Sequence, residues 1–172
     1  MQVLSDPAQI ESPLIRDLFI YWQSRCRSGA IPRRSDIDPM ALRHILPNLL
    51  LVEFELEPFR VKFRLVGTKV VEFTGFEFTG TYLDEIAQPE VGHSFIDCYE
   101  TACRSRQPVF RRITWRFDEE STADYDFCVL PLDDNGTVAT KAVAAECYER
   151  LERQYDLSTM KSRNTGQPLR ER

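Results

Sequence analysis

The chain is poor in the residue types that most often carry chemistry. It has 172 residues but only two histidines, His44 and His93, and its seven glycines form no phosphate-binding loop. A GxSxG motif is also absent. The five cysteines are an odd number, widely scattered, with no CxxC pair. This pattern fits reduced thiols in a cytoplasm better than a disulfide frame or a zinc site.

Long apolar runs and an excess of basic residues are missing too. No apolar run approaches the length that spans a membrane, and the first residues lack the basic and apolar regions of a secretory signal. The net charge of −5 argues against a general nucleic-acid binder. We therefore expect a cytoplasmic protein that neither inserts into membranes nor binds nucleic acid.

The composition that remains is typical of a globular protein. Hydrophobic residues make up 42% and charged residues 28% of the chain, which is enough to form a core. The length favours one domain. We expect a flexible tail over residues 1–12, a single domain over 13–148, and a short helical extension with a disordered tail over 149–172.

The most informative stretch runs from Phe59 to Leu83. Its first part, Phe59 to Leu65, alternates apolar and charged residues and predicts a half-buried strand whose apolar side includes Leu65. Gly67 interrupts this strand, and Gly75 follows a segment long enough for a short helix at 69–74. We expect positive φ at both glycines. A second short helix is predicted at 83–87, so the stretch forms a helical cap over a sheet.

The flanking regions supply a helix and the remaining strands. Ser12 and Pro13 are typical of a helix start, and an amphipathic helix is predicted over 13–28. Its large apolar face packs either on its own domain or on a second copy of the chain. Asp38 and Pro39 predict a short helix that ends before Pro47. Further elements are expected at 49–56 (strand), 90–106 (helix), 109–117, 125–132 and 138–147 (strands).

Three separated motifs carry a family resemblance: IPRRSDIDPMALRHILPNLLLVEFE, FRLVGT and FTGTYLDEI. Together with the order of elements, they resemble the PAS superfamily, and most closely a group of short stand-alone bacterial PAS proteins. The resemblance covers roughly residues 14 to 148 by the element order. It implies an α+β fold with a five-stranded antiparallel sheet, helices across one face, and the additional N-terminal amphipathic helix.

PAS receptors carry flavin, haem or small metabolites, so the resemblance raises the question of a cofactor. Covalent flavin photochemistry needs a reactive cysteine on the cap, and residues 67–87 contain none. Haem needs an axial ligand, for which His93 is the candidate by position. However, His93 falls in a polar segment off the expected apolar stripe, so a surface or capping role is favoured. The cofactor stays unknown.

A cavity between cap and sheet is the expected binding site. The resemblance groups aromatic residues from distant segments around it, with Thr68 and Arg64 as polar candidates for orienting a ligand; the aromatic set is Phe63, Phe73, Phe78, Phe95 and Trp115. The alternative is that these rings simply fill the core. Arg64 faces away from the core by alternation, which favours a surface ion pair.

Three functions remain open. The first is a cytoplasmic sensory or adaptor domain without catalytic output, which binds a small molecule, a signalling partner, or both, and forms a homodimer through the N-terminal helix. The second is a small enzyme with a curved-sheet cone fold and an inward acid or base, although the expected inward positions are nearly all apolar. The third is a purely structural interaction or dimerisation module.

Overall fold

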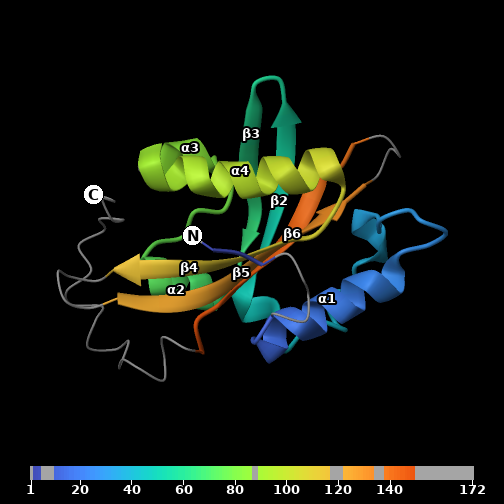
Figure 1. Cartoon of the computed structure of the whole chain (residues 1–172), viewed down its shortest axis with the longest axis horizontal. Coiled ribbons are helices and arrows are strands. Elements are labelled where there is room, and N and C mark those ends of the chain that lie inside the picture. Colours follow the sequence, from blue (N-terminus) through green and yellow to red (C-terminus); the bar gives the residue numbers. More distant parts are fainter. Residues whose placement is uncertain (1, 5–9, 87–88, 117–121, 134–137, 150–172) are drawn as a thin grey trace.

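The structure, a computed structural model of the whole chain, describes residues 2–4, 10–86, 89–116, 122–133 and 138–149. The tail expected beyond residue 149 lies outside these residues, as do residues 117–121 and 134–137 between the expected strands. The described residues form one antiparallel sheet with helices on both of its faces (Figure 1).

The sheet has six strands in the order β1-β4-β5-β6-β2-β3. Five of them were predicted, and their antiparallel pairing is confirmed. The sixth, β1, comes from the expected flexible tail and pairs with the edge strand β4. Sequence patterns could not predict it because three residues are too few to show alternation. The strands are β1 (Gln2–Leu4), β2 (Leu49–Leu56), β3 (Phe59–Val66), β4 (Val109–Arg116), β5 (Thr122–Leu132) and β6 (Lys141–Cys147).

Four α-helices and two 3-10 turns complete the domain. Helix α1 begins as predicted, since the Ser12 hydroxyl accepts a hydrogen bond from the Ile15 N–H at 3.3 Å and Pro13 occupies the first turn. It ends at Arg25, and the chain then reverses through the left-handed Ser28 and Gly29. The helices are α1 (Pro13–Arg25), α2 (Thr68–Thr74), α3 (Leu83–Ile86) and α4 (Pro89–Ser105), with 3-10 turns η2 (Arg34–Asp36) and η3 (Leu46–Asn48).

The prediction of a short helix after Asp38 is wrong. Residues 39–45 form successive turns, closed by i→i+3 bonds such as that from the Leu42 N–H to the Pro39 carbonyl at 3.1 Å. The Asp38 side chain does cap this segment, because its carboxylate accepts the Met40 N–H at 2.9 Å. The capping signal was therefore correct, but the segment continues as turns and not as a regular helix.

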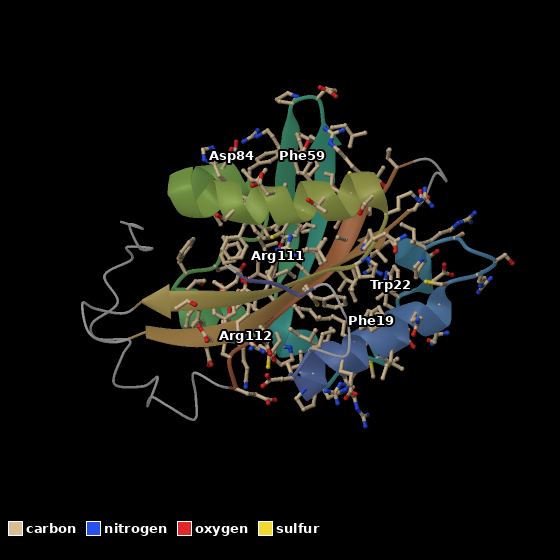
Figure 2. The ribbon with its side chains drawn as sticks, viewed as in Figure 1. Phe19, Trp22, Phe59, Asp84, Arg111 and Arg112 are labelled. Atoms are coloured by element: carbon tan, nitrogen blue, oxygen red, sulfur yellow. The ribbon has the colours of Figure 1, made fainter. Side chains whose placement is uncertain are left out.

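Helix α1 packs on the sheet of its own domain. Ile15, Leu18 and Trp22 are buried, and the Trp22 indole donates a hydrogen bond to the Pro131 carbonyl of β5 at 2.9 Å. Figure 2 shows Phe19 and Trp22 on the sheet-facing side of the helix, and the Phe19 ring meets Phe110 of β4 edge-on at 5.3 Å. The apolar face that suggested a homodimer is thus covered within one chain, as the alternative held.

The strand β3 departs from strict alternation at Arg64. Leu51 pairs with Leu65 and Val52 with Phe63, so Arg64 is an extra residue opposite β2. Such a bulge shifts the side-chain pattern by one position. Val61 and Phe63 point into the core as expected, but Leu65 is 40% exposed and Val66 takes the buried position. The prediction that Leu65 faces the core is therefore wrong.

The two glycines beside α2 differ. Gly75 has φ of 85° and ends the helix in the left-handed conformation, as predicted. Gly67 has φ of −69°, so the prediction of positive φ there is wrong. Its requirement is space instead: a Cβ at this position would lie 2.3 Å from the Pro47 carbonyl oxygen. The Gly67 N–H also donates to the Leu49 carbonyl at 2.7 Å, which holds the two segments together.

Backbone segments line both edges of the sheet. At one edge β1 pairs with β4. At the other, Phe63 of β3 exchanges hydrogen bonds with the loop that leads to α3, accepting from the Gly80 N–H at 2.7 Å and donating to the Thr81 carbonyl at 3.0 Å. Tyr82 continues this contact as an isolated bridge to Lys62. The middle of β3 is therefore occupied by the chain itself.

We expect Gly67→Ala to destabilise the domain by about 3 kcal/mol or more, since the new methyl group meets backbone that cannot rotate away. Gly75→Ala is the control, because open space surrounds that position and only the strained φ matters, at about 1–2 kcal/mol. Urea unfolding of both variants measures the difference. Equal losses would contradict the close-approach explanation for Gly67.

We also expect Leu18→Ala to lower the free energy of unfolding by about 2–5 kcal/mol, because Leu18 is fully buried on the sheet-facing side of α1. Ile20→Ala on the same helix is the matched control, since Ile20 is 56% exposed and should change stability by about 0.5 kcal/mol or less. If α1 packs within one chain, the Leu18→Ala loss does not vary with protein concentration. A loss that grows on dilution would indicate packing between two chains.

Candidate functional site

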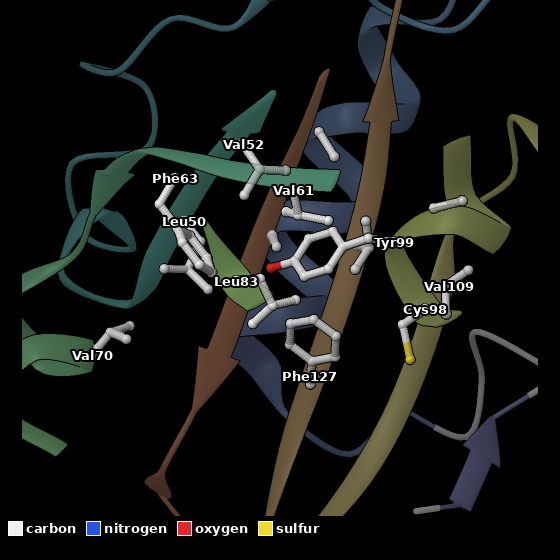
Figure 3. Close-up of a cluster of buried hydrophobic side chains, with 14 of the residues drawn as sticks. Leu50, Val52, Val61, Phe63, Val70, Leu83, Cys98, Tyr99, Val109 and Phe127 are labelled. Carbon is white, nitrogen blue, oxygen red and sulfur yellow. The ribbon is translucent and has the colours of Figure 1, made fainter. Parts of the chain in front are cut away.

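The candidate site lies between the sheet and the cap formed by α2, α3 and α4. One cluster of apolar and aromatic side chains fills this layer (Figure 3). Each cap helix contributes a buried residue, namely Val70 from α2, Leu83 from α3 and Tyr99 from α4. On the sheet side, Phe63 and Phe127 lie in the same cluster. The layer is therefore built from segments far apart in the sequence, as predicted.

Four of the predicted site residues meet in this layer. Phe63 and Phe78 are buried and contact each other edge-on, with ring centroids 4.7 Å apart. Phe95 of α4 and Phe73 of α2 are partly buried against the same cluster. Trp115 lies on β4 opposite Ala123, but its side chain is outside the described part of the structure.

Two predicted site residues do not belong to the layer. Arg64 and Thr68 are both exposed. The Arg64 guanidinium lies 3.3 Å from the Glu53 carboxylate, and both side chains are substantially exposed. This is the surface ion pair that the alternative interpretation of Arg64 favoured, and such pairs contribute little to stability.

The main polar group of the layer is Glu146, which the sequence analysis missed. Its residue is 8% exposed, and its carboxylate accepts a hydrogen bond from the Tyr148 hydroxyl. Ala142 and Ala144, at four and two residues before it on β6, lie in the cap-side cluster. Alternation places Glu146 on this same side. The expectation that inward positions are nearly all apolar is wrong at this residue.

Aromatic rings from three elements surround this polar group. The Tyr148 ring stacks on Phe73 of α2 with centroids 4.3 Å apart, and it lies 5.2 Å from the Tyr125 ring of β5. Tyr99 of α4 is buried to 1% exposure. On the far side of the strand backbone, the Asn48 amide donates to the Glu146 carbonyl at 2.7 Å. The exit of β6 is thus fixed by both backbone and side-chain contacts.

Burial raises the pKa of Glu146 to about 7, and the hydrogen bond from Tyr148 partly offsets this rise. Burial also raises the pKa values of Tyr99, Tyr125 and Tyr148 well above the ordinary value, with the Glu146 charge as a further cause. No ion pair to Glu146 occurs among the described residues. This layer therefore combines neutral rings with one carboxyl group that ionises near neutral pH.

The cofactor candidates from the sequence find no support in the geometry. His93 is exposed on α4 and outside the buried layer. Within the described residues, no three or more His, Cys, Asp or Glu side chains gather in a way that can hold a metal ion. None of the helices described is both long and apolar enough to cross a bilayer.

Glu146 makes a testable contribution to the pH dependence of stability. Its pKa in the folded chain, about 7, exceeds the ordinary 4.5, so the folded state binds the proton more tightly. Stability from this group is fully present below the ordinary pKa and falls as pH rises to about 7. Between about pH 5 and pH 8, the unfolding free energy of the unchanged protein should therefore fall by about 2–3 kcal/mol more than that of Glu146→Gln. An unchanged pH profile in urea unfolding would refute this assignment.

Among comparisons with known proteins, the match to a family model identifies the family of this domain. A family model described as "PAS domain" matches residues 10–143. Among solved structures, that of an RNA-binding light-oxygen-voltage receptor is similar, with a TM-score of 0.45 and 14% sequence identity; the match covers 80% of this chain and 40% of the receptor chain. No curated protein matches the chain. The match to the family model over most of the chain, together with the five predicted antiparallel strands and their helical cap, shows that this protein belongs to the PAS domain family.

Proposed function

We propose that this PAS domain is a sensory or adaptor module that binds a small, largely apolar molecule between the sheet and the cap. PAS domains are in general sensory and signalling modules rather than enzymes, and the family match supports this broad role. The proposed lining consists of Phe63, Phe73, Phe78, Phe95 and Trp115. Arg64 and Thr68 are left out of it because both lie exposed, away from the aromatic layer.

The observation that carries the proposal is that the two short cap helices, α2 and α3, are weakly anchored to the sheet. Helix α2 buries only Val70 and helix α3 only Leu83. Large rings at the boundary, Phe73 and Phe95, are only partly buried. Segments with few buried apolar contacts open at lower free-energy cost than the core of a domain. Helices α2 and α3 can therefore separate from the sheet and admit a molecule while α4 and the sheet stay in place.

The polar end of the ligand is proposed to face Glu146. Small-molecule sites are mostly apolar, with a few polar groups that set orientation. Glu146 is the buried carboxyl of this layer, and Tyr148 and Tyr125 stand beside it. Titratable groups with a shifted pKa cluster at functional sites, which supports this placement. A ligand with a hydrogen-bond donor beside an apolar body fits these surroundings.

Location and assembly complete the proposal. We propose a cytoplasmic protein, supported by the five cysteines, none of which forms a disulfide in the structure. A homodimer remains our prediction. Since the apolar face of α1 is covered, contact through this helix has to use its outer side, where Ile20 is 56% exposed. The cone-fold enzyme is no longer favoured, because the chain belongs to the PAS family.

Phe73→Ala tests the binding site. We expect it to weaken binding of the co-purified molecule by tenfold or more, and to lower the unfolding free energy by about 2–3 kcal/mol, below the range for a fully buried ring. Phe76→Ala is the matched control, because Phe76 is 47% exposed on the same cap segment and should alter neither quantity appreciably.

The molecule itself is identified by native mass spectrometry and an absorbance spectrum of freshly purified protein. A retained small molecule whose binding depends on Phe73 supports the sensory function. An empty protein, in which Phe73→Ala affects stability alone, would overturn it and leave a filled core with a structural interaction role.

A further inference from the structure

We propose that Glu146 is a proton-operated switch that couples the exit of the last strand to cap helix α2. The coupling passes through a short chain of contacts: the Glu146 carboxyl, the Tyr148 hydroxyl, the Tyr148 ring and the Phe73 ring of α2. The inference concerns the protein without ligand, so it stands apart from the proposed binding function.

The geometry places a charge change at a point where the structure has no means to neutralise it. Glu146 is buried, and among the described residues its carboxylate has the Tyr148 hydroxyl as hydrogen-bond partner and no cation. A buried carboxylate without a cation is costly, whereas the neutral acid is tolerated. Ionisation therefore favours any rearrangement that brings water to the carboxylate.

Other titratable groups facing this interior stay neutral around pH 7. They come from the surrounding elements: Tyr99 and Cys98 from α4, Tyr125 from β5, and Tyr148 after β6. Burial raises the pKa of each of them above its ordinary value. On β4, Arg111 alternates with Val109 and Ile113 toward the same cluster, and its guanidinium interacts with Cys98. On α2, Glu72 is exposed and Lys69 is partly exposed. The shift in the pKa of Glu146 arises from burial and the Tyr148 hydrogen bond, without a contribution from these cations.

Helix α2 gives way more readily than the sheet on which it lies. It has seven residues, buries only Val70, and is joined to the following chain at the left-handed Gly75. Its Phe73 is only partly buried and rests on Tyr148. In contrast, the β6 backbone at Glu146 is held by pairing to Phe127 and by the Asn48 amide. When Glu146 ionises, the stack of Tyr148 on Phe73 therefore loosens before the sheet does.

Hydrogen–deuterium exchange of the full chain tests the switch. After correction for intrinsic exchange, we expect residues 68–74 to exchange about tenfold faster or more at about pH 8 than at about pH 6, with the midpoint near the pKa of Glu146. Glu146→Gln should keep the low-pH protection at both values. Glu72→Gln, an exposed carboxyl on α2, is the matched control and should behave as the unchanged protein.

A second variant separates the switch from a general loss of packing. Tyr148→Phe keeps the ring on Phe73 but removes the hydroxyl. Because the hydrogen bond from this hydroxyl lowers the pKa of Glu146, its loss raises that pKa. The midpoint, followed by NMR of the Glu146 carboxyl carbon and by exchange of α2, should therefore move to higher pH. The histidine variants His44→Gln and His93→Gln should leave it in place, although histidines ordinarily titrate near this range.

Three results would overturn the proposal: exchange of α2 that does not depend on pH, a pH dependence that persists in Glu146→Gln, or a midpoint that Tyr148→Phe leaves unmoved. If Glu146→Gln does not fold, the Tyr148→Phe titration alone decides. Loss of ligand binding in Phe73→Ala bears on the binding function and leaves this test unaffected.

Discussion

The need to cover the central strands on both faces determines how this domain is built. Along β5 and β6, residues 125–132 and 142–147 are all buried. Their side chains alternate between the cap-side cluster and the cluster under α1. Because neither face of these strands reaches water, each needs its own helical cover. The N-terminal helix is therefore as much a part of the core as the cap is.

Secondary structure was largely predictable wherever its signals are local. The strands β2 and β3 lie toward one edge, and their alternation of apolar and charged residues is visible in the sequence. The helix cap at Ser12 and the helix stop at Gly75 depend on local geometry alone. They can therefore also be predicted from the sequence without knowledge of tertiary contacts. The errors came where distant segments decide: the bulge at Arg64, the close approach of Gly67 to Pro47, and the short strand β1.

The aromatic layer between cap and sheet was predicted in position, but its buried carboxyl group was not. Aromatic residues of the cap and sheet are numerous enough for their gathering to be inferred from fold resemblance, and Phe63 and Phe78 do meet. Glu146 stood in a run of small apolar residues, where one acid carries no pattern of its own. Its burial follows only from the register of β6 within the finished sheet. The opposite error, placing Arg64 and Thr68 near a ligand, came from polarity without knowledge of where each side chain points.

The edges of the sheet have a consequence for how partners recognise this protein. An open strand edge offers unpaired amide and carbonyl groups, which invite strand addition by peptides and edge-to-edge aggregation. Here β1 occupies one edge, and the loop at Gly80 and Thr81 occupies the middle of the other. The backbone groups at residues 110–112 of β4 and at the middle of β3 are therefore already paired within the chain. A partner that approaches these two places has to bind through side chains, which makes recognition there depend on sequence rather than on shared backbone geometry.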